Sequence, residues 1–298
     1  MKSLLLLLTI PLLAQSRIEV QITAAETKSN TRLQFAGTNE NTINERDITT
    51  FNLTKENLKA GVNSYFGASP TDIFLNNPTL WGDLYTENKW KPVTKILKPL
   101  RARILELNYF PYVISNEVFN NTASIRSSAR VQIGAPLEEV VMSFWENPVD
   151  SSTEGIKYTF NVESSAIPSK STFSYVSKFG ENVLNSRSVF IGSETGLVVT
   201  LEPEQAVHVE LVATKGTMKA KLDYKTVLSG SLAVNYDPRY KDHHFWSLDI
   251  NKVMEAARLN CTRVSSEVID FSFYVNSKVN IRDFRTNEVL SSVPLAVF

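Results

Sequence analysis

Apolar and polar residues alternate along most of the chain from about residue 103 to its end, in runs separated by turn-forming residues. Neighbouring side chains of a strand point to opposite faces, so this alternation is typical of sheets with one buried and one exposed face. The predicted strands cover 104–107, 113–114, 117–133, 140–145, 156–162, 172–179, 188–191, 196–201, 206–215, 217–228, 231–236, 268–275 and 279–284. The pattern predicts a mainly β fold, β-rich within the α+β class, with a tight hairpin at Lys215-Gly216-Thr217.

The most regular alternation begins at Gly155 and predicts an amphipathic hairpin over about 154–180, with a turn at 164–169. The apolar face of this hairpin would carry Ile156, Tyr158, Phe160, Val162, Phe173, Tyr175 and Phe179. A strand of a transmembrane β-barrel has roughly 9–11 residues that face lipid and lumen alternately, and each arm is close to that length. The same pattern also fits a hairpin that covers a soluble core, so both interpretations stay open.

The chain before residue 105 has a different residue pattern. Glycine and proline interrupt it at Gly61, Gly67, Pro70, Pro78, Gly82, Pro92 and Pro99. Only short helices and turns fit between such interruptions, and we expect helical turns at 55–65 and 79–87. Apolar residues at 18–22 predict a strand at the edge of a sheet.

We therefore divide the chain into an aromatic-rich N-terminal head over 17–105 and an elongated β module over 106–298. The module contains one predicted helix at 250–259, where four apolar residues recur at helical spacing. These residues are Ile250, Val253, Met254 and Ala257.

Residues 1–16 have the three parts of a secretory signal peptide. Lys2 is basic, an apolar run extends from Leu4 to Leu13, and Ala14 and Ser16 supply the small residues of a cleavage site. A membrane-spanning helix needs about 20 apolar residues, so this run is too short to be an anchor. We expect a secreted, extracellular protein whose mature chain begins near residue 17.

Two further features bear on a secreted chain. Asn52, Asn120 and Asn260 each begin an acceptor triplet for N-glycosylation. Cys261 is the single cysteine, so we expect a small buried apolar residue, with an intermolecular link as the alternative.

The charges balance, with 31 basic and 31 acidic residues, so no long-range field favours nucleic acid as a partner. Candidate chemistry is sparse. The three histidines show no metal-binding spacing, and the chain has neither a phosphate-binding glycine loop nor a nucleophile elbow. We expect no enzymatic activity, no catalytic residues, no metal and no cofactor.

Three segments of the chain carry a family resemblance. The run from Trp81 to Tyr85, with Trp90-Lys91-Pro92-Val93 and Lys98-Pro99-Leu100, resembles spherulin-2A-like proteins, which include follicle-cell yolk polypeptides of moths. The stretch from Gly196 to Tyr236 resembles the strands of aerolysin and epsilon-toxin-type proteins, and Phe119-Asn120-Asn121-Thr122 matches the entry into their long sheet. The resemblance implies a long antiparallel sheet module, a separate head, and a stowed hairpin that in pore-forming relatives is released to build a barrel. In this chain the resemblance implies that the insertion hairpin is about 154–180. Its lipid-facing candidates would be Ile156, Tyr158, Phe160, Val162, Phe173, Tyr175 and Phe179.

Three functions follow as hypotheses. The first is a secreted β-pore-forming protein that oligomerises with its own copies and acts on membrane lipid or a surface receptor. The second is a yolk or storage protein made by follicle cells, which needs no active site. The third is a carbohydrate-binding module in which Trp81, Tyr85 and Trp90 stack on sugars.

Overall fold

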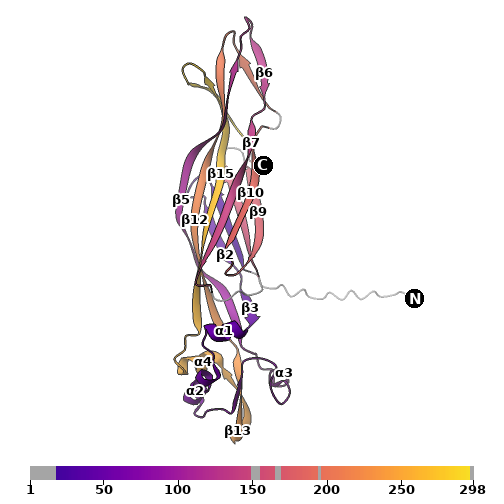
Figure 1. Cartoon of the computed structure of the whole chain (residues 1–298), viewed down its shortest axis with the longest axis vertical. Helices are drawn as coiled ribbons and strands as arrows, with labels where there is room; N and C mark the ends of the chain where they lie inside the picture. The colour runs from indigo at the N-terminus through magenta and orange to yellow at the C-terminus, as the bar shows by residue number, and fades with distance from the viewer. Residues whose placement is uncertain (1–17, 149–154, 165–168, 194–195, 296–298) are drawn as a thin grey trace, which may run out of the picture.

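The computed structural model describes residues 18–148, 155–164, 169–193 and 196–295. The molecule is elongated, and three long antiparallel strands run along most of its length (Figure 1). These strands are β5 (Thr94–Asn120), β12 (Ala206–Ser229) and β15 (Thr262–Asp283). They form the centre of a seven-stranded sheet in the order β10-β7-β15-β12-β5-β3, with β16 paired to β15. The remaining members are β3 (Asn39–Thr42), β7 (Gly134–Glu146), β10 (Val183–Gly192) and β16 (Val289–Pro294).

A second, four-stranded sheet covers the middle of this long sheet. Its order is β2 (Arg32–Ala36), β1 (Glu19–Ala25), β8 (Gly155–Ser164) and β9 (Ser169–Lys178). β1 runs parallel to β8, whereas the other two pairs of neighbours are antiparallel. The alternating apolar residues of both sheets meet between them and form the largest apolar cluster, which includes Tyr224, Phe271 and Phe273 of the long sheet.

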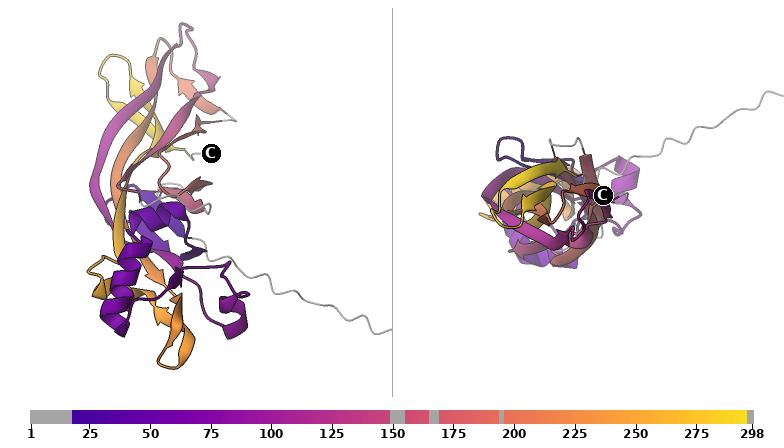
Figure 2. Two further views of the ribbon diagram at one scale, coloured as in Figure 1. Left: turned by 60° about the horizontal axis from the view of Figure 1, so that its bottom comes forward. Right: turned by 90° about the horizontal axis from the view of Figure 1, so that it is seen from above.

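The helices gather at one end of the molecule, which the left view of Figure 2 brings forward. They are α1 (Glu45–Thr50), α2 (Lys55–Phe66), α3 (Leu84–Asn88) and α4 (Ile250–Ala256), beside a small sheet of β4 (Asp72–Phe74), β13 (Ser231–Tyr240) and β14 (His243–Asp249). Thr54 caps the start of α2, and Gly67 ends it with a positive φ of 100°. A buried ion pair of 2.8 Å between Lys95 and Asp47 ties this helical end to β5.

The opposite end of the molecule is a narrow tip. There β6 (Ser127–Val131) pairs with β11 (Leu197–Leu201) and covers the far part of β12 and β15. The buried amide of Asn121 donates hydrogen bonds to the carbonyl oxygens of Ile125, Leu201 and Glu202 and so closes this end.

The predicted mainly β, β-rich α+β class is confirmed. The helices expected at 55–65, 79–87 and 250–259 are present as α2, α3 and α4, with shifted ends. The edge strand expected at 18–22 is wrong, because β1 lies between β2 and β8 and is buried on one face. The predicted signal peptide lies outside the described residues.

The division at residue 105 stays a prediction, although the helical end combines residues from both sides of it. Its apolar cluster joins α2 to α4 and β13, whereas β1 and β2 lie in the middle of the molecule. Cys261 is partly exposed and packs against the same cluster, so its expected full burial is not observed.

The tight hairpin predicted at Gly216 is also wrong. β12 continues straight through this residue, which pairs with Tyr109 on one side and with Phe273 on the other. A Cβ atom at position 216 would collide with the buried ring of Phe273. Gly216 is therefore needed because an aromatic ring on the next strand covers its backbone.

We predict that Gly216→Ala lowers the free energy of unfolding by about 1–3 kcal/mol, because the added methyl group overpacks a rigid part of the core. Chemical denaturation measures this change. Thr217→Ala, one residue along on the other face of β12, is the matched control and should have less than half the effect. Equal losses in both variants would contradict the explanation.

Candidate functional site

β8 and β9 form the amphipathic hairpin that the sequence predicts. Their antiparallel register pairs Tyr158 with Tyr175 and Phe160 with Phe173, and each strand has 10 residues. Residue 154 and the turn at 165–168 lie outside the described residues. The paired rings stack, with centroids 5.1 Å and 4.9 Å apart, respectively. The two strands therefore present one continuous aromatic face.

That aromatic face is turned toward the long sheet. Ile156, Tyr158, Phe160, Val162 and Phe179 are almost fully buried, and Phe173 and Tyr175 are partly buried against the same cluster. The ring of Phe160 contacts Phe271 of β15 at a centroid distance of 4.9 Å. All seven candidate residues thus lie on the core side of the hairpin, where each fully buried apolar side chain contributes about 1.5–3 kcal/mol.

The opposite face of the hairpin is mostly polar. Lys157, Thr159 and Asn161 of β8 alternate with the apolar residues, and Thr172 and Ser174 do so on β9. Asn161 is itself buried, and Val176 on this face of β9 is about half exposed. Lys157 forms a 3.5 Å ion pair with Glu19 of β1, and Thr172 donates a hydrogen bond to Asn161. β9 is the last strand in the order of its sheet. The hairpin therefore lies at an edge, with β1 as its neighbour on the other side.

A buried carboxylate lies beneath the aromatic face. Glu267 of β15 is fully buried and accepts hydrogen bonds from the hydroxyls of Tyr158 (2.8 Å) and Tyr224 (3.0 Å) and from that of Ser143. Burial raises the pKa of the Glu267 carboxyl to about 7, although these three hydrogen bonds oppose the rise. Among the described residues no lysine or arginine forms an ion pair with it.

A second polar contact holds β9. Arg187 of β10 forms a 2.8 Å ion pair with the buried Glu139 of β7, donates a hydrogen bond to Ser171 of β9, and lies over the ring of Phe173 at 5.0 Å. Burial raises the pKa of the Glu139 carboxyl against the opposing effect of Arg187. The Nε atom of Arg187 is buried without a hydrogen-bond partner among the described residues. The long sheet thus holds the hairpin through polar groups as well as through aromatic rings.

The three aromatic residues expected to stack on sugars do not form one surface. Tyr85 is buried, and its hydroxyl donates to carbonyl oxygens of Phe74 and Ser231. Its ring is therefore part of the core of the helical end, which corrects its assignment as a stacking residue. Trp81 is about half exposed and packs edge-on against Phe74, and Trp90 is partly buried.

The other predicted sites are placed but not tested. Asn52, Asn120 and Asn260 are all exposed, as glycosylation would require, and their modification stays a prediction. No group of three metal-ligating side chains occurs among the described residues. None of the described helices combines the length and apolar character that a membrane-spanning helix needs.

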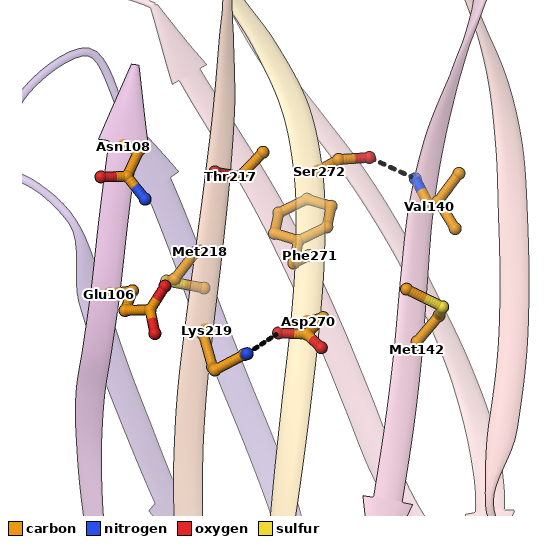
Figure 3. Close-up of a pocket in the computed structure, with 10 residues that line it drawn as sticks. All are labelled: Glu106, Asn108, Val140, Met142, Thr217, Met218, Lys219, Asp270, Phe271 and Ser272. Atoms are coloured by element: carbon orange, nitrogen blue, oxygen red, sulfur yellow. Dashed lines mark hydrogen bonds and ion pairs between the residues drawn. The ribbon is translucent and has the colours of Figure 1, made fainter. Parts of the chain in front are cut away.

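A pocket of about 240 Å³ lies over the outer face of the long sheet (Figure 3). Glu106, Lys219 and Asp270 line it beside Val140 and Met142, and Lys219 and Asp270 form an ion pair of 3.8 Å. The pocket lies on the opposite side of the sheet from the hairpin. Sequence patterns gave no sign of this pocket or of the buried hydrogen bonds of Glu267.

Structural comparison places this fold with the aerolysin-like β proteins. The chain is similar to parasporin-2, a Bacillus thuringiensis toxin that recognises cancer cells. The TM-score is 0.56 and the identity 11%, with 82% of this chain and 98% of that chain covered. At this identity the likeness concerns the fold alone.

Sequence comparison gives the family. The chain is 32% identical to U-megalopygitoxin(8)-Mc8 of Megalopyge crispata, over 85% of this chain and 88% of the relative. It is also 32% identical to U-megalopygitoxin(8)-Mo12 of Megalopyge opercularis, over 84% and 86% of the two chains. The chain belongs to the U-megalopygitoxin(8) family. No protein-family model matches it.

These comparisons support one part of the predicted family resemblance and not the other. Its aerolysin-type part is confirmed, because the fold is that of a toxin-like β protein. Its spherulin-2A and yolk-polypeptide part has no support, because the relatives found by sequence are named as toxins. The storage hypothesis loses its basis for the same reason.

We predict that Arg187→Gln lowers the free energy of unfolding by about 3 kcal/mol, because it leaves Glu139 buried without its cation. Arg126→Gln is the matched control. Arg126 pairs with Glu202 on the exposed tip, where both side chains are more than 60% exposed, and the loss there should be below about 1 kcal/mol. Urea denaturation measures the free energy of unfolding of both variants. A loss in Arg187→Gln no larger than that in Arg126→Gln would contradict the idea that Arg187 holds β9 against the long sheet.

Proposed function

We propose that this protein is a secreted, non-enzymatic toxin that acts on membranes by releasing the β8–β9 hairpin, which joins hairpins of further copies in a transmembrane β-barrel. The observation that most supports this proposal is the hairpin itself. It has two strands of 10 residues, a continuous aromatic face and a mostly polar opposite face. Strands of a transmembrane barrel need about 9–11 residues with this alternation. The aerolysin-like fold and the toxin relatives support the proposal.

The physics of an inserted hairpin requires several copies. An extended segment in lipid must satisfy every backbone hydrogen bond, and only a closed barrel leaves no strand edge. Two strands from one chain cannot close such a barrel, so copies must assemble. Homo-oligomerisation at a lipid surface or on a surface receptor is therefore part of the proposal.

The polar face of the hairpin suits the lumen of such a barrel. Lys157, Thr159 and Ser174 would face water there, while the aromatic residues that now contact β15 would face lipid. Insertion exchanges one apolar environment for another. The apolar face is therefore shielded from water both in the stowed state and in the inserted state. Residues 1–16 would supply the export that a toxin requires.

The aromatic face is buried in the core, so substitutions within it cannot test membrane insertion alone. Placing an arginine at position 160 or 175 would disrupt the stowed core before any membrane is met, because both side chains pack in it. A covalent lock that leaves every core residue in place avoids this difficulty.

We predict that a disulfide between β1 and β8 abolishes dye release from liposomes until it is reduced. The lock is Gln21→Cys with Thr159→Cys, which are register partners on the outer face, in a Cys261→Ser background. Neighbouring strands lie about 4.8 Å apart, within the span of a disulfide. Release should return when a reductant is added.

The matched control is Thr159→Cys with Ser174→Cys, which links β8 to β9 within the hairpin. This pair keeps the hairpin intact but lets it leave as a unit, so dye release should persist when it is oxidised. If the reduced proteins release no dye from liposomes of any lipid composition, with or without limited proteolysis, the proposed pore function is wrong.

A further inference from the structure

The only carboxylate that contacts the aromatic face of the hairpin from below, among the described residues, is Glu267. Its two oxygens lie 2.9 Å and 2.8 Å from the hydroxyl of Tyr158, which is 109 residues away in the chain and belongs to β8. The other two hydrogen bonds come from Ser143 of β7 and Tyr224 of β12, both members of the long sheet. Release of the hairpin would therefore remove one of three donors and open the carboxyl group to water.

The groups that face Glu267 from the surrounding strands are hydroxyls. They are Ser143 of β7, Tyr158 of β8, Tyr175 of β9 and Tyr224 of β12. Burial raises the pKa of each of the three tyrosines above its ordinary value, and the negative charge of Glu267 raises it further, so they stay neutral at physiological pH. Glu267 is thus the one group of this set whose charge changes near neutrality.

We propose that Glu267 is a proton-controlled latch: its protonated form keeps the hairpin stowed, and loss of its proton on going to neutral and alkaline pH favours release. This inference rests on the proposed function of the hairpin and names the condition that triggers it. The geometry carries it, because a carboxylate with no cation is sealed under the element that must move. An ionised carboxyl is far better solvated in water than in an apolar interior, so its charge favours the open state.

The direction of the effect follows from proton linkage. The stowed state holds the Glu267 proton with a pKa of about 7, whereas an exposed glutamate has the ordinary value of 4.5. Between these values the stowed state binds more protons, so stability of the stowed state falls as the pH rises through this window. From pH 5 to pH 8 the open-to-stowed ratio should increase on the order of 50-fold.

A second buried carboxyl could supply a competing pH dependence. Glu139 contacts β9 through Arg187, and burial raises its pKa as well. Its charge is compensated by the neighbouring guanidinium, whereas that of Glu267 has only hydroxyl partners. A variant that removes the titration of Glu267 alone separates the two carboxyls.

The test measures hydrogen exchange of the backbone of β8 and β9, residues 155–164 and 169–178, in the intact protein without lipid at pH 5 to 8. The rates are expressed as protection factors so that the chemical effect of pH is removed. Wild-type protection should fall on the order of 50-fold across this range. In Glu267→Gln the change should be below about threefold, with protection at pH 8 close to that of wild type at low pH. Glu138→Gln, the same substitution at an exposed carboxyl on β7, should behave as wild type.

A second variant guards against simple loss of folding in Glu267→Gln. Tyr158→Phe removes one donor to the ionised carboxyl, so the midpoint of the protection curve should move to higher pH. A merely structural role of Tyr158 would change protection equally at every pH and leave the midpoint in place.

The outcomes separate the latch from the pore. Wild-type protection that does not change with pH, or a Glu267→Gln profile identical to that of wild type, overturns the latch. Liposome dye release measured in parallel reports on the pore alone. If protection follows pH as expected and no dye is released, the latch stands and the proposed function fails. If dye is released with the same pH profile in wild type and Glu267→Gln, the pore stands and the latch fails.

Discussion

The contact between the aromatic face of the β8–β9 hairpin and the long sheet is the interaction on which the rest of the structure depends. Phe160 on Phe271 and the stacked pairs across the hairpin join the two sheets into one core. The hydrophobic effect that forms this contact is non-directional, and a lipid interior satisfies the same side chains as well as a protein interior does. One face can therefore serve two environments, which is what a segment that leaves the protein for a membrane needs.

Polar groups within this contact make the stowed position of the hairpin less stable than a fully apolar contact would. Well-packed apolar residues at the positions of a buried ion pair are often at least as stabilising as the pair itself. The interface under the hairpin nonetheless contains Glu267, which pairs with no cation among the residues the structure describes. It also contains the Glu139–Arg187 pair, whose Nε has no hydrogen-bond partner among those same residues. A hairpin that only covered a core would need none of these groups, because well-packed apolar residues in their place are often at least as stabilising. Their presence fits an element whose stowed position is one of two states.

Local signals in the sequence predicted only part of the local structure. Period-two alternation identified both arms of the hairpin, because side-chain direction in a strand depends on the backbone alone. The strands that pair with a given strand lie far from it in the sequence, so the sequence patterns did not predict which strands would be neighbours. Nothing near Glu267 in the chain reveals that Tyr158 lies above it, and nothing near Gly216 reveals the ring of Phe273. A glycine between two alternating runs looks like a turn until the neighbouring strand is known, and a buried tyrosine such as Tyr85 looks like any other aromatic residue.

The molecule has separate apolar cores, which explains how the β8–β9 hairpin could be released without unfolding the rest of the protein. Among the described residues, none of those in the apolar clusters of the helical end and of the tip belongs to β8 or β9. The buried Lys95–Asp47 pair ties the helical end to β5. The three long strands pair with one another along most of their length, so their backbone hydrogen bonds would survive the departure of the hairpin. Release would then open only the central cluster, whose long-sheet face would stay exposed until the neighbouring strands β1 and β2 or a further copy covered it. That exposed face gives the open state a reason to associate, since burying apolar surface is the main driving force of assembly.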